Sequence, residues 1–148
     1  MPSTVIVEYD AAWPVRARRL LGEVRSALAP LPGADGFAYE HIGSTAVPGL
    51  GAKPGDQADD AAYEKRLFHS SAEGAILHIR RTDSPFARFV DFRDWLRCHP
   101  EQALRYEQIK RRLADEHAGG QDYDDYTRAK TAFFTEIGPR LRDWAAGS

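Results

Sequence analysis

The clearest chemical signal in the sequence is Gly43-Ser44-Thr45, which follows an expected strand over residues 37–42. Glycine lets the backbone approach a ligand closely, and the two hydroxyls and nearby N–H groups can donate hydrogen bonds to a phosphate. This pattern is typical of a phosphate cradle. Gly-Ser-Thr is also common in capped turns, and on these three residues alone a structural loop is the favoured interpretation.

Two of the five histidines are placed for proton exchange beside this loop. His41 is separated from Gly43 by one residue, and His78 falls on an expected neighbouring strand, so both can face one pocket. An equally good interpretation is that His41 orients the loop through a hydrogen bond. The other three histidines lack a partner at useful spacing and are expected at the surface or at helix caps: His69, His99 and His117.

Two arginines four residues apart in an expected helix, Arg93 and Arg97, can present their guanidinium groups to one phosphate or carboxylate. The structural alternative pairs them with Asp94, with Glu101 or with solvent. A second pair, also one helical turn apart, permits a joint ligand contact: Tyr126 and Lys130.

Short strands and one amphipathic helix are expected before the loop. The β-branched residues of 4–9 predict a strand closed by Asp10, which can cap the next helix. Apolar residues recur at three- and four-residue intervals over 11–28, which predicts an amphipathic helix terminated by the prolines that follow it. Residues 37–42 predict a second strand.

A hairpin and three helices are expected after the loop. Leu67-Phe68 and residues 75–79 predict two strands around a Glu-Gly turn, with His78 and Arg80 on one sheet face. Beyond them, Ser-Pro and His-Pro dipeptides open helices over 84–99 and 100–117, and a third helix runs from about 122 to a break at the Gly-Pro pair 138–139. Six aromatic residues at helix-stripe positions are expected in the core: Trp13, Phe89, Phe92, Trp95, Phe133 and Phe134.

The composition predicts one domain over residues 1–148 and excludes several classes of protein. The 20 basic and 22 acidic side chains give a net charge of −2, so no global field favours nucleic acid or an anionic membrane. The single cysteine, Cys98, excludes an internal disulfide and a four-cysteine zinc site. Without an apolar run of roughly 20 residues, we expect a cytoplasmic protein with no membrane partner.

The longer string from His41 to Leu50, followed by Ala52-Lys53-Pro54, resembles the signature of the GrpB family, which is related to the nucleotidyltransferase superfamily. The resemblance covers both ends of the chain. Its further matches are Val7 to Asp10, Trp13-Pro14, Phe92 to Arg97, His99-Pro100, Tyr106, Lys110, Leu113-Ala114, Tyr126 and Lys130.

The resemblance implies an α/β (α+β) fold: a nucleotidyltransferase-like mixed β-sheet with packed helices over about 1–82 and a helical part over 83–148. Gly43 and Ser44 match the phosphate-binding pair. Asp56 is the nearest match to a carboxylate that binds Mg²⁺ for nucleotidyl transfer. The implied catalytic residues are His41, Lys53 and Asp56, and the implied ligand-binding residues are Gly43, Ser44, Thr45, His78, Arg80, Arg93, Arg97, Lys110, Tyr126 and Lys130.

The sequence departs from the family pattern directly after Lys53-Pro54. The family continues there with an apolar strand that carries the carboxylate, whereas residues 55–63 are mostly small and polar. Asp56 stands one residue early, and Gln57 occupies a position where an apolar residue anchors the strand. A central strand is therefore expected to be missing, either deleted or omitted from the sequence.

Two functions remain open from the sequence. The first is binding of a nucleotide or another phosphorylated small molecule, with or without nucleotidyl transfer. The alternative is a non-catalytic anion-binding or structural protein that has lost the metal-bearing strand. The oligomeric state and the physiological substrate are not determined by the sequence.

Overall fold

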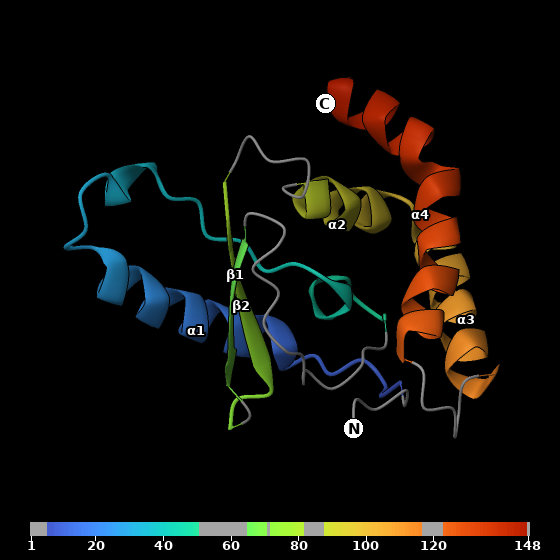
Figure 1. Cartoon of the computed structure of the whole chain (residues 1–148), viewed down its shortest axis with the longest axis horizontal. Helices are drawn as coiled ribbons and strands as arrows, with labels where there is room; N and C mark the ends of the chain where they lie inside the picture. Colours follow the sequence, from blue (N-terminus) through green and yellow to red (C-terminus); the bar gives the residue numbers. More distant parts are fainter. Residues whose placement is uncertain (1–5, 51–64, 71, 82–87, 117–122, 148) are drawn as a thin grey trace.

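The computed structural model describes residues 6–50, 65–70, 72–81, 88–116 and 123–147, with backbone only for 65–67, 69 and 123–130. Its elements are α1 (Trp13–Leu28), the 3₁₀ turns η1 (Ala34–Gly36) and η2 (Ser44–Ala46), strands β1 (Lys65–Ser70) and β2 (Ala75–Arg80), and helices α2 (Phe89–Cys98), α3 (Pro100–Glu116) and α4 (Tyr123–Ala146). Figure 1 shows α1 and the β1–β2 hairpin on one side of the molecule and α2, α3 and α4 on the other.

Helix α1 confirms the amphipathic prediction. Its six stripe residues are all half-buried, whereas its arginines are exposed: the stripe is Trp13, Ala17, Leu20, Leu21, Val24 and Leu28. Asp10 accepts a hydrogen bond from the Ala12 amide at 2.8 Å, so it closes the turn before the helix rather than capping the helix itself. The helix contacts η2. One amphipathic face of α1 thus supports the loop that carries Gly-Ser-Thr.

The two strands form the predicted antiparallel hairpin. Phe68 lies opposite Leu77, and Leu67 lies opposite His78. The turn places Gly74 at φ +58°, a left-handed conformation that glycine adopts without strain. Because side chains alternate between faces, His78 and Arg80 share one face, as predicted.

The main core forms where α2, α3 and α4 meet the loop after η2. Its buried members come from all four segments: Val47, Leu50, Phe92, Trp95, Leu96, Tyr106, Phe133 and Ile137. The Phe92 ring meets the rings of Tyr106 and Phe134 edge-on, at centroid distances of 5.4 and 4.9 Å. Phe89 is 38% exposed, so its expected place in the core was wrong.

Two predictions of secondary structure were also wrong. Residues 37–42 form no strand, because this segment is extended coil between η1 and η2. Helix α4 does not end at the Gly-Pro pair but continues through Pro139 to Ala146. The apolar stripe continues past the proline, and Ile137, Leu141 and Trp144 all pack on the core, which offsets the lost backbone hydrogen bond. Figure 1 shows the helix bending in this half.

Several expectations fall outside the described residues or are only partly tested. Residues 4 and 5 of the first strand, the irregular segment 51–62, the Ser-Pro helix start at 84–85 and residues 117–122 lie outside them. In the described part of residues 4–9, Val7 forms an isolated bridge. Within the described residues, no helix combines the length and apolar character that a bilayer span requires.

The buried anchor of the loop can be tested with two leucines. Leu50 is 2% exposed and Leu104 is 59% exposed. We expect Leu50→Ala to lower the free energy of unfolding by roughly 2–5 kcal/mol, because it leaves a cavity in the core. Leu104→Ala is the control and should change it by less than about 0.5 kcal/mol. Urea denaturation monitored by tryptophan fluorescence measures both, and similar losses for the two variants would contradict the assignment of Leu50 to the core.

Candidate functional site

The Gly-Ser-Thr loop has a backbone conformation that only glycine adopts easily. Gly43 has φ +81° and ψ −172°, a region of the Ramachandran map that is essentially closed to other residues. The Gly43 carbonyl accepts a hydrogen bond from the Ala46 amide at 3.0 Å, and the Ser44 carbonyl accepts one from the Val47 amide at 3.1 Å. Gly43 therefore starts the tight turn that presents Ser44 and Thr45.

Burial and a hydrogen bond to the backbone hold the end of the loop against the helical part. Val47 and Leu50, both 2% exposed, lie in the main core. Arg97 on α2 donates from Nε to the Ala46 carbonyl at 2.9 Å. The chain after the turn is thus fixed against α2, so the position of Ser44 depends on helix packing.

A buried lysine lies against the loop. Lys110 on α3 is 3% exposed, and its Nζ donates to Ser44 Oγ at 2.8 Å. Its ammonium group also lies 5.2 Å from the centre of the Tyr106 ring and 3.9 Å from Glu107 Oε2. Glu107 is held more closely by Arg111, whose Nε lies 2.7 Å from Glu107 Oε1. The structure therefore directs a buried positive charge at the serine hydroxyl.

A second buried cation lies beneath the start of the loop. Arg93 on α2 is 8% exposed and donates to Asp94 from Nε at 2.8 Å, to Glu40 from Nη1, and to the His41 carbonyl at 3.1 Å. The contact with Arg93 lowers the pKa of Asp94, and the contact with Asp94 raises the pKa of Arg93. Two carboxylates thus compensate this guanidinium, which holds the chain before Gly43 in place.

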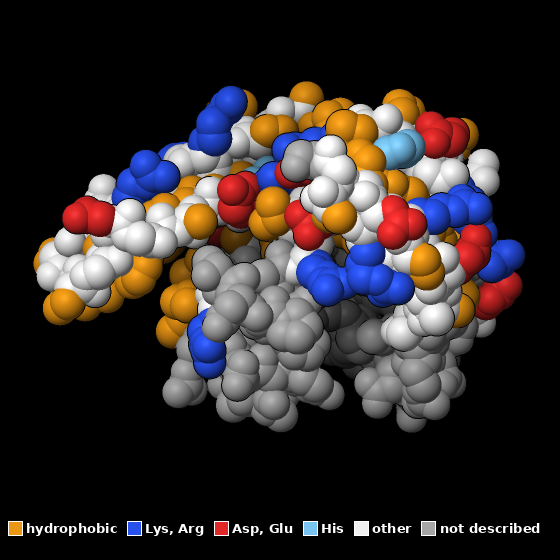
Figure 2. All heavy atoms as spheres, turned by 90° about the horizontal axis from the view of Figure 1, so that it is seen from above, with side chains coloured by type: hydrophobic (Ala, Val, Ile, Leu, Met, Phe, Trp, Pro, Cys, Tyr) orange, Lys and Arg blue, Asp and Glu red, His pale blue; other side chains and the backbone are white. Residues whose placement is uncertain are grey.

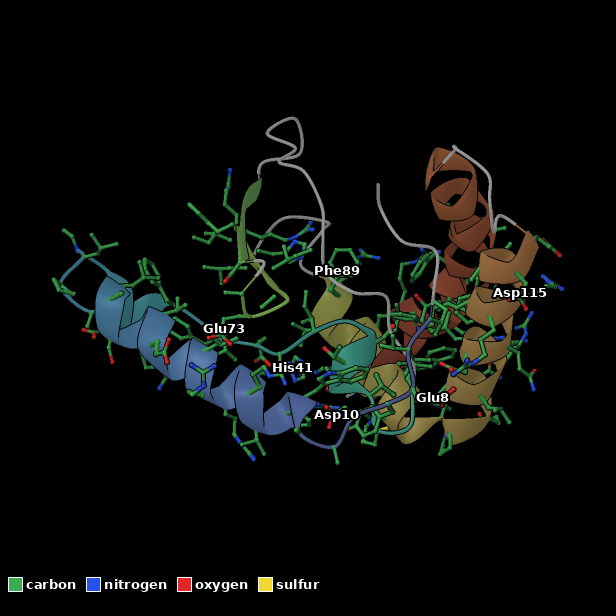
Figure 3. All side chains as sticks on the ribbon, turned by 90° about the horizontal axis from the view of Figure 1, so that it is seen from below. Glu8, Asp10, His41, Glu73, Phe89 and Asp115 are labelled. Carbon is green, nitrogen blue, oxygen red and sulfur yellow. The ribbon has the colours of Figure 1, made fainter. Side chains whose placement is uncertain are left out.

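His41 contacts the loop directly. Its Nε2 lies 2.8 Å from Thr45 Oγ1, across the turn that Gly43 starts. Figure 3 shows His41 between α1 and η2. Burial lowers the pKa of His41, and the positive charges of Arg97 and Arg93 lower it further. His41 is therefore kept neutral near pH 7 and orients the loop, as the structural alternative supposed.

A hollow of about 150 Å³ opens beside the loop. Among the described residues it is lined by Gly43, Ser44 and Arg93 and by seven apolar or aromatic residues: Val47, Leu50, Phe89, Phe92, Leu96, Tyr106 and Phe134. The hollow therefore lies between the loop and helices α2, α3 and α4.

The structure brings seven of the predicted site residues together: His41, Gly43, Ser44, Thr45, Arg93, Arg97 and Lys110. Arg80, on β2, is not among the lining residues, but its guanidinium lies 4.7 Å from the centre of the ring of Phe89, which does line the hollow, and burial lowers the pKa of Arg80. His78 is on the same strand and lines neither this hollow nor its neighbour at α4. Lys53 and Asp56 lie outside the described residues, as do the side chains of Tyr126 and Lys130.

Sequence reasoning missed two features of the site. Glu40 was not expected to pair with Arg93, although it directly precedes the signature that begins at His41. The contact of Lys110 with Ser44 joins residues 66 positions apart, and local spacing carries no information about it. The pairing of Arg93 and Arg97 with Asp94 was one of the alternatives considered, and it is found.

Charge on the surface is mixed rather than one-sided. Figure 2 shows Lys and Arg side chains interspersed with Asp and Glu on the face that it displays. Ion pairs at the surface include those of Arg105 with Glu136 at 2.7 Å and of Arg19 with Glu73 at 2.7 Å. On the displayed face, positive charge is thus not gathered into one broad patch.

Comparison with known proteins places the chain in a family. The sequence profile of the GrpB protein family matches residues 3–55 and 56–140, which is most of the chain. The protein belongs to the GrpB family. A UPF0157 protein of Halalkalibacterium halodurans is 32% identical over 163 residues, covering 91% of this chain and 80% of that protein. A UPF0157 protein of Streptomyces coelicolor is 31% identical over 158 residues, covering 90% of this chain and 81% of the relative.

A solved structure confirms the α/β fold class. The crystal structure of the conserved protein GrpB from Enterococcus faecalis superposes with a TM-score of 0.73 at 24% identity, covering 95% of this chain and 99% of that one. At this level of identity the likeness concerns the fold alone.

The comparisons also locate a difference in length within this GrpB protein. The alignment to the Halalkalibacterium protein is 163 residues long although this chain has only 148, so the relative carries residues without a counterpart here. The family profile is interrupted between residues 55 and 56, next to Asp56. The interruption coincides with the point at which the sequence departs from the family pattern.

The conformation of Gly43 can be tested against a second glycine. A Cβ at Gly43 or at Gly22 meets no atom within 4 Å, so neither substitution causes a clash. We expect Gly43→Ala to lower the free energy of unfolding by about 1–3 kcal/mol because of its φ. Gly22→Ala, within α1, should raise it by roughly 0.5–1 kcal/mol. Thermal and urea denaturation measure both, and two changes of the same sign would argue against the described turn.

The neutral state of His41 predicts a pH dependence. Because its folded pKa lies below the ordinary value of 6.5, the unfolded chain binds the proton first as the pH falls. The free energy of unfolding should therefore decrease as the pH falls through about 6.5 and level off below the folded pKa. His41→Gln should reduce this decrease. Histidine NMR titration measures the pKa directly, and a His41 pKa at or above the ordinary value would refute the prediction.

Proposed function

We propose that this GrpB-family protein binds a nucleotide or another phosphorylated small molecule and that the loop Gly43–Thr45 receives the phosphate. The observation that carries the proposal is the buried Lys110 ammonium group held 2.8 Å from Ser44 Oγ. A positive charge beside a serine hydroxyl and an exposed glycine turn suits a ligand that brings negative charge, because hydrogen bonds from a charged donor are the stronger kind.

The chemistry of the loop matches a phosphate in three respects. The Lys110 ammonium and the Ser44 hydroxyl supply donors, and hydrogen bonds from a charged donor are the stronger kind. The absence of a side chain at Gly43 leaves room for a phosphate oxygen near the backbone. Arg97, about two fifths exposed while bound to the Ala46 carbonyl, adds positive charge at the other end of the turn.

Arg93 has a different part in this proposal. Its guanidinium is engaged by Glu40 and Asp94 and by the His41 carbonyl. We therefore assign it to holding the loop in position rather than to neutralising the phosphate. The resemblance to the family adds Lys53, Tyr126 and Lys130 as further ligand contacts.

Nucleotidyl transfer would need a divalent metal, which the resemblance assigns to Asp56 with Mg²⁺. In the part of the chain that the structure describes, no three His, Cys, Asp or Glu side chains come together as a metal site. The described residues therefore do not form a Mg²⁺ site, and we derive no metal-dependent step. Transfer at Asp56 remains a prediction.

A second candidate function, binding without catalysis, has an observation in its favour. The family profile is interrupted between residues 55 and 56, where the resemblance places the carboxylate-bearing strand. A chain that lacks this strand keeps the loop, Lys110 and the hollow. Such a chain can therefore bind the ligand without catalysing nucleotidyl transfer.

Calorimetric titration with ATP, GTP, CTP and UTP, with and without Mg²⁺, tests both functions. We expect Ser44→Ala to weaken binding by about tenfold or more, because it removes a hydrogen-bonding partner of the phosphate and of Lys110. Ser26→Ala, exposed on α1, is the matched control and should bind as the unmodified protein does.

Asp56→Asn separates the two functions. If the site binds Mg²⁺ for transfer, this variant loses the part of the affinity that depends on Mg²⁺. If the nucleotide affinity is the same with and without Mg²⁺ and is unchanged by Asp56→Asn, the non-catalytic function is identified. If none of the four nucleotides and no simpler phosphate compound binds, the proposal is wrong.

A further inference from the structure

The hollow beside the loop indicates what the phosphate of the ligand is attached to. Its described lining contains Gly43, Ser44 and Arg93. Val47, Leu50 and Leu96, each 2% exposed, are the most buried of its lining residues. Gly43 is exposed and Phe89 is 38% exposed, so these two residues are the ones that solvent reaches. Among the described residues, a ligand held at Ser44 that enters the hollow thus meets mainly apolar and aromatic side chains.

The wall of the hollow selects against a polar group. A nucleobase carries several hydrogen-bonding groups on its edge, and a buried donor or acceptor without a partner costs about 1–3 kcal/mol. Among the residues that the structure describes, the side chains of the lining beyond Ser44 and Arg93 are Val, Leu, Phe and Tyr, and the Tyr106 hydroxyl is the one polar group among them. Arg93 is already engaged by two carboxylates. An apolar ring meets this wall without leaving a polar group unpaired.

The volume of the hollow sets the size of that ring. It is about 150 Å³. An engineered cavity of about 150 Å³ with Leu, Ile and Phe walls binds benzene, so this volume accommodates one six-membered ring. A second hollow of about 230 Å³ shares Phe89, Phe92 and Phe134 but contains none of the loop residues. A ligand anchored at the loop therefore fills the first hollow first.

We propose that the ligand of this site is a phosphate ester of a small alcohol with a single apolar ring, with the phosphate at Ser44 and Lys110 and the ring in the hollow. This inference rests on the proposed function, from which it selects a non-nucleotide ligand. Figure 3 shows Phe89, one of the two surface residues of the hollow, at the start of α2.

Phenyl phosphate is the probe, and inorganic phosphate and phenol are its two halves. Titrations are made at a pH at which both phosphate compounds carry two negative charges, so that charge does not differ between them. We expect phenyl phosphate to bind at least about tenfold more tightly than inorganic phosphate, since burial of one ring suffices for this factor. It should also bind more tightly than CMP and AMP.

Two variants locate the two halves of the ligand. Ser44→Ala should weaken inorganic phosphate and phenyl phosphate by the same factor. Val47→Ile adds one carbon to the wall of the hollow, so it should weaken phenyl phosphate by a larger factor than inorganic phosphate. Val24→Ile, half-buried on α1, is the control for the added carbon.

The outcomes distinguish this inference from the proposed function. If inorganic phosphate binds and the phenyl group adds nothing, or if CMP or AMP binds more tightly, the ring assignment is overturned and the phosphate site remains. If phenol binds without phosphate binding, the two groups do not share a site and the inference is overturned. If neither phosphate compound nor any nucleotide binds, both proposals fail. The comparison of ligands on the unmodified protein decides these cases even if a variant does not fold.

Discussion

The candidate site depends above all on the burial of two aliphatic side chains just after the Gly-Ser-Thr turn. Val47 and Leu50 are each 2% exposed and lie among the aromatic residues of α2, α3 and α4. Full burial of an aliphatic side chain contributes about 1.5–3 kcal/mol. Without this anchor, the segment 37–50, which consists of coil and the 3₁₀ turn η2, has no regular hydrogen-bond ladder to fix it. The geometry at Ser44 is therefore a product of the helical core.

Charge around the loop is arranged in two different ways. Arg93 is buried, and Glu40, Asp94 and the His41 carbonyl compensate its charge, so removal of one of them leaves a buried charge less well compensated. Lys110 is directed at the Ser44 hydroxyl, with Glu107 Oε2 at 3.9 Å. The first arrangement is typical of a structural contact. The second places a positive charge next to the hydroxyl of the loop, which is the basis of the function proposed above.

The sequence predicted local structure well and long-range structure poorly. Helix α1, the hairpin and the boundary between α2 and α3 were predicted because each leaves a local signal: an apolar stripe, a glycine turn and a His-Pro pair. The strand over 37–42 was wrong because alternation in so short a segment does not show whether a neighbouring strand is present. Pro139 was read as a helix end because the packing of Leu141 and Trp144 on a distant core is not visible locally. The loop was found through its signature, but its partners, Glu40 for Arg93 and Lys110 for Ser44, follow from tertiary packing.

Helix α2 holds the loop on both sides of Gly43. Arg93 binds the carbonyl of residue 41, and Arg97, four positions later, binds the carbonyl of residue 46. Four residues of an α-helix span about 6 Å, so one turn of α2 sets the distance that the intervening loop must bridge. The number of residues between these two carbonyls is thereby fixed, as is the glycine at position 43. An insertion or deletion within 42–45 would break one of the two contacts, whereas a substitution outside Gly43 would keep both. In the divergence of this family, the length of the loop is therefore expected to change less readily than the identity of the residues around Gly43.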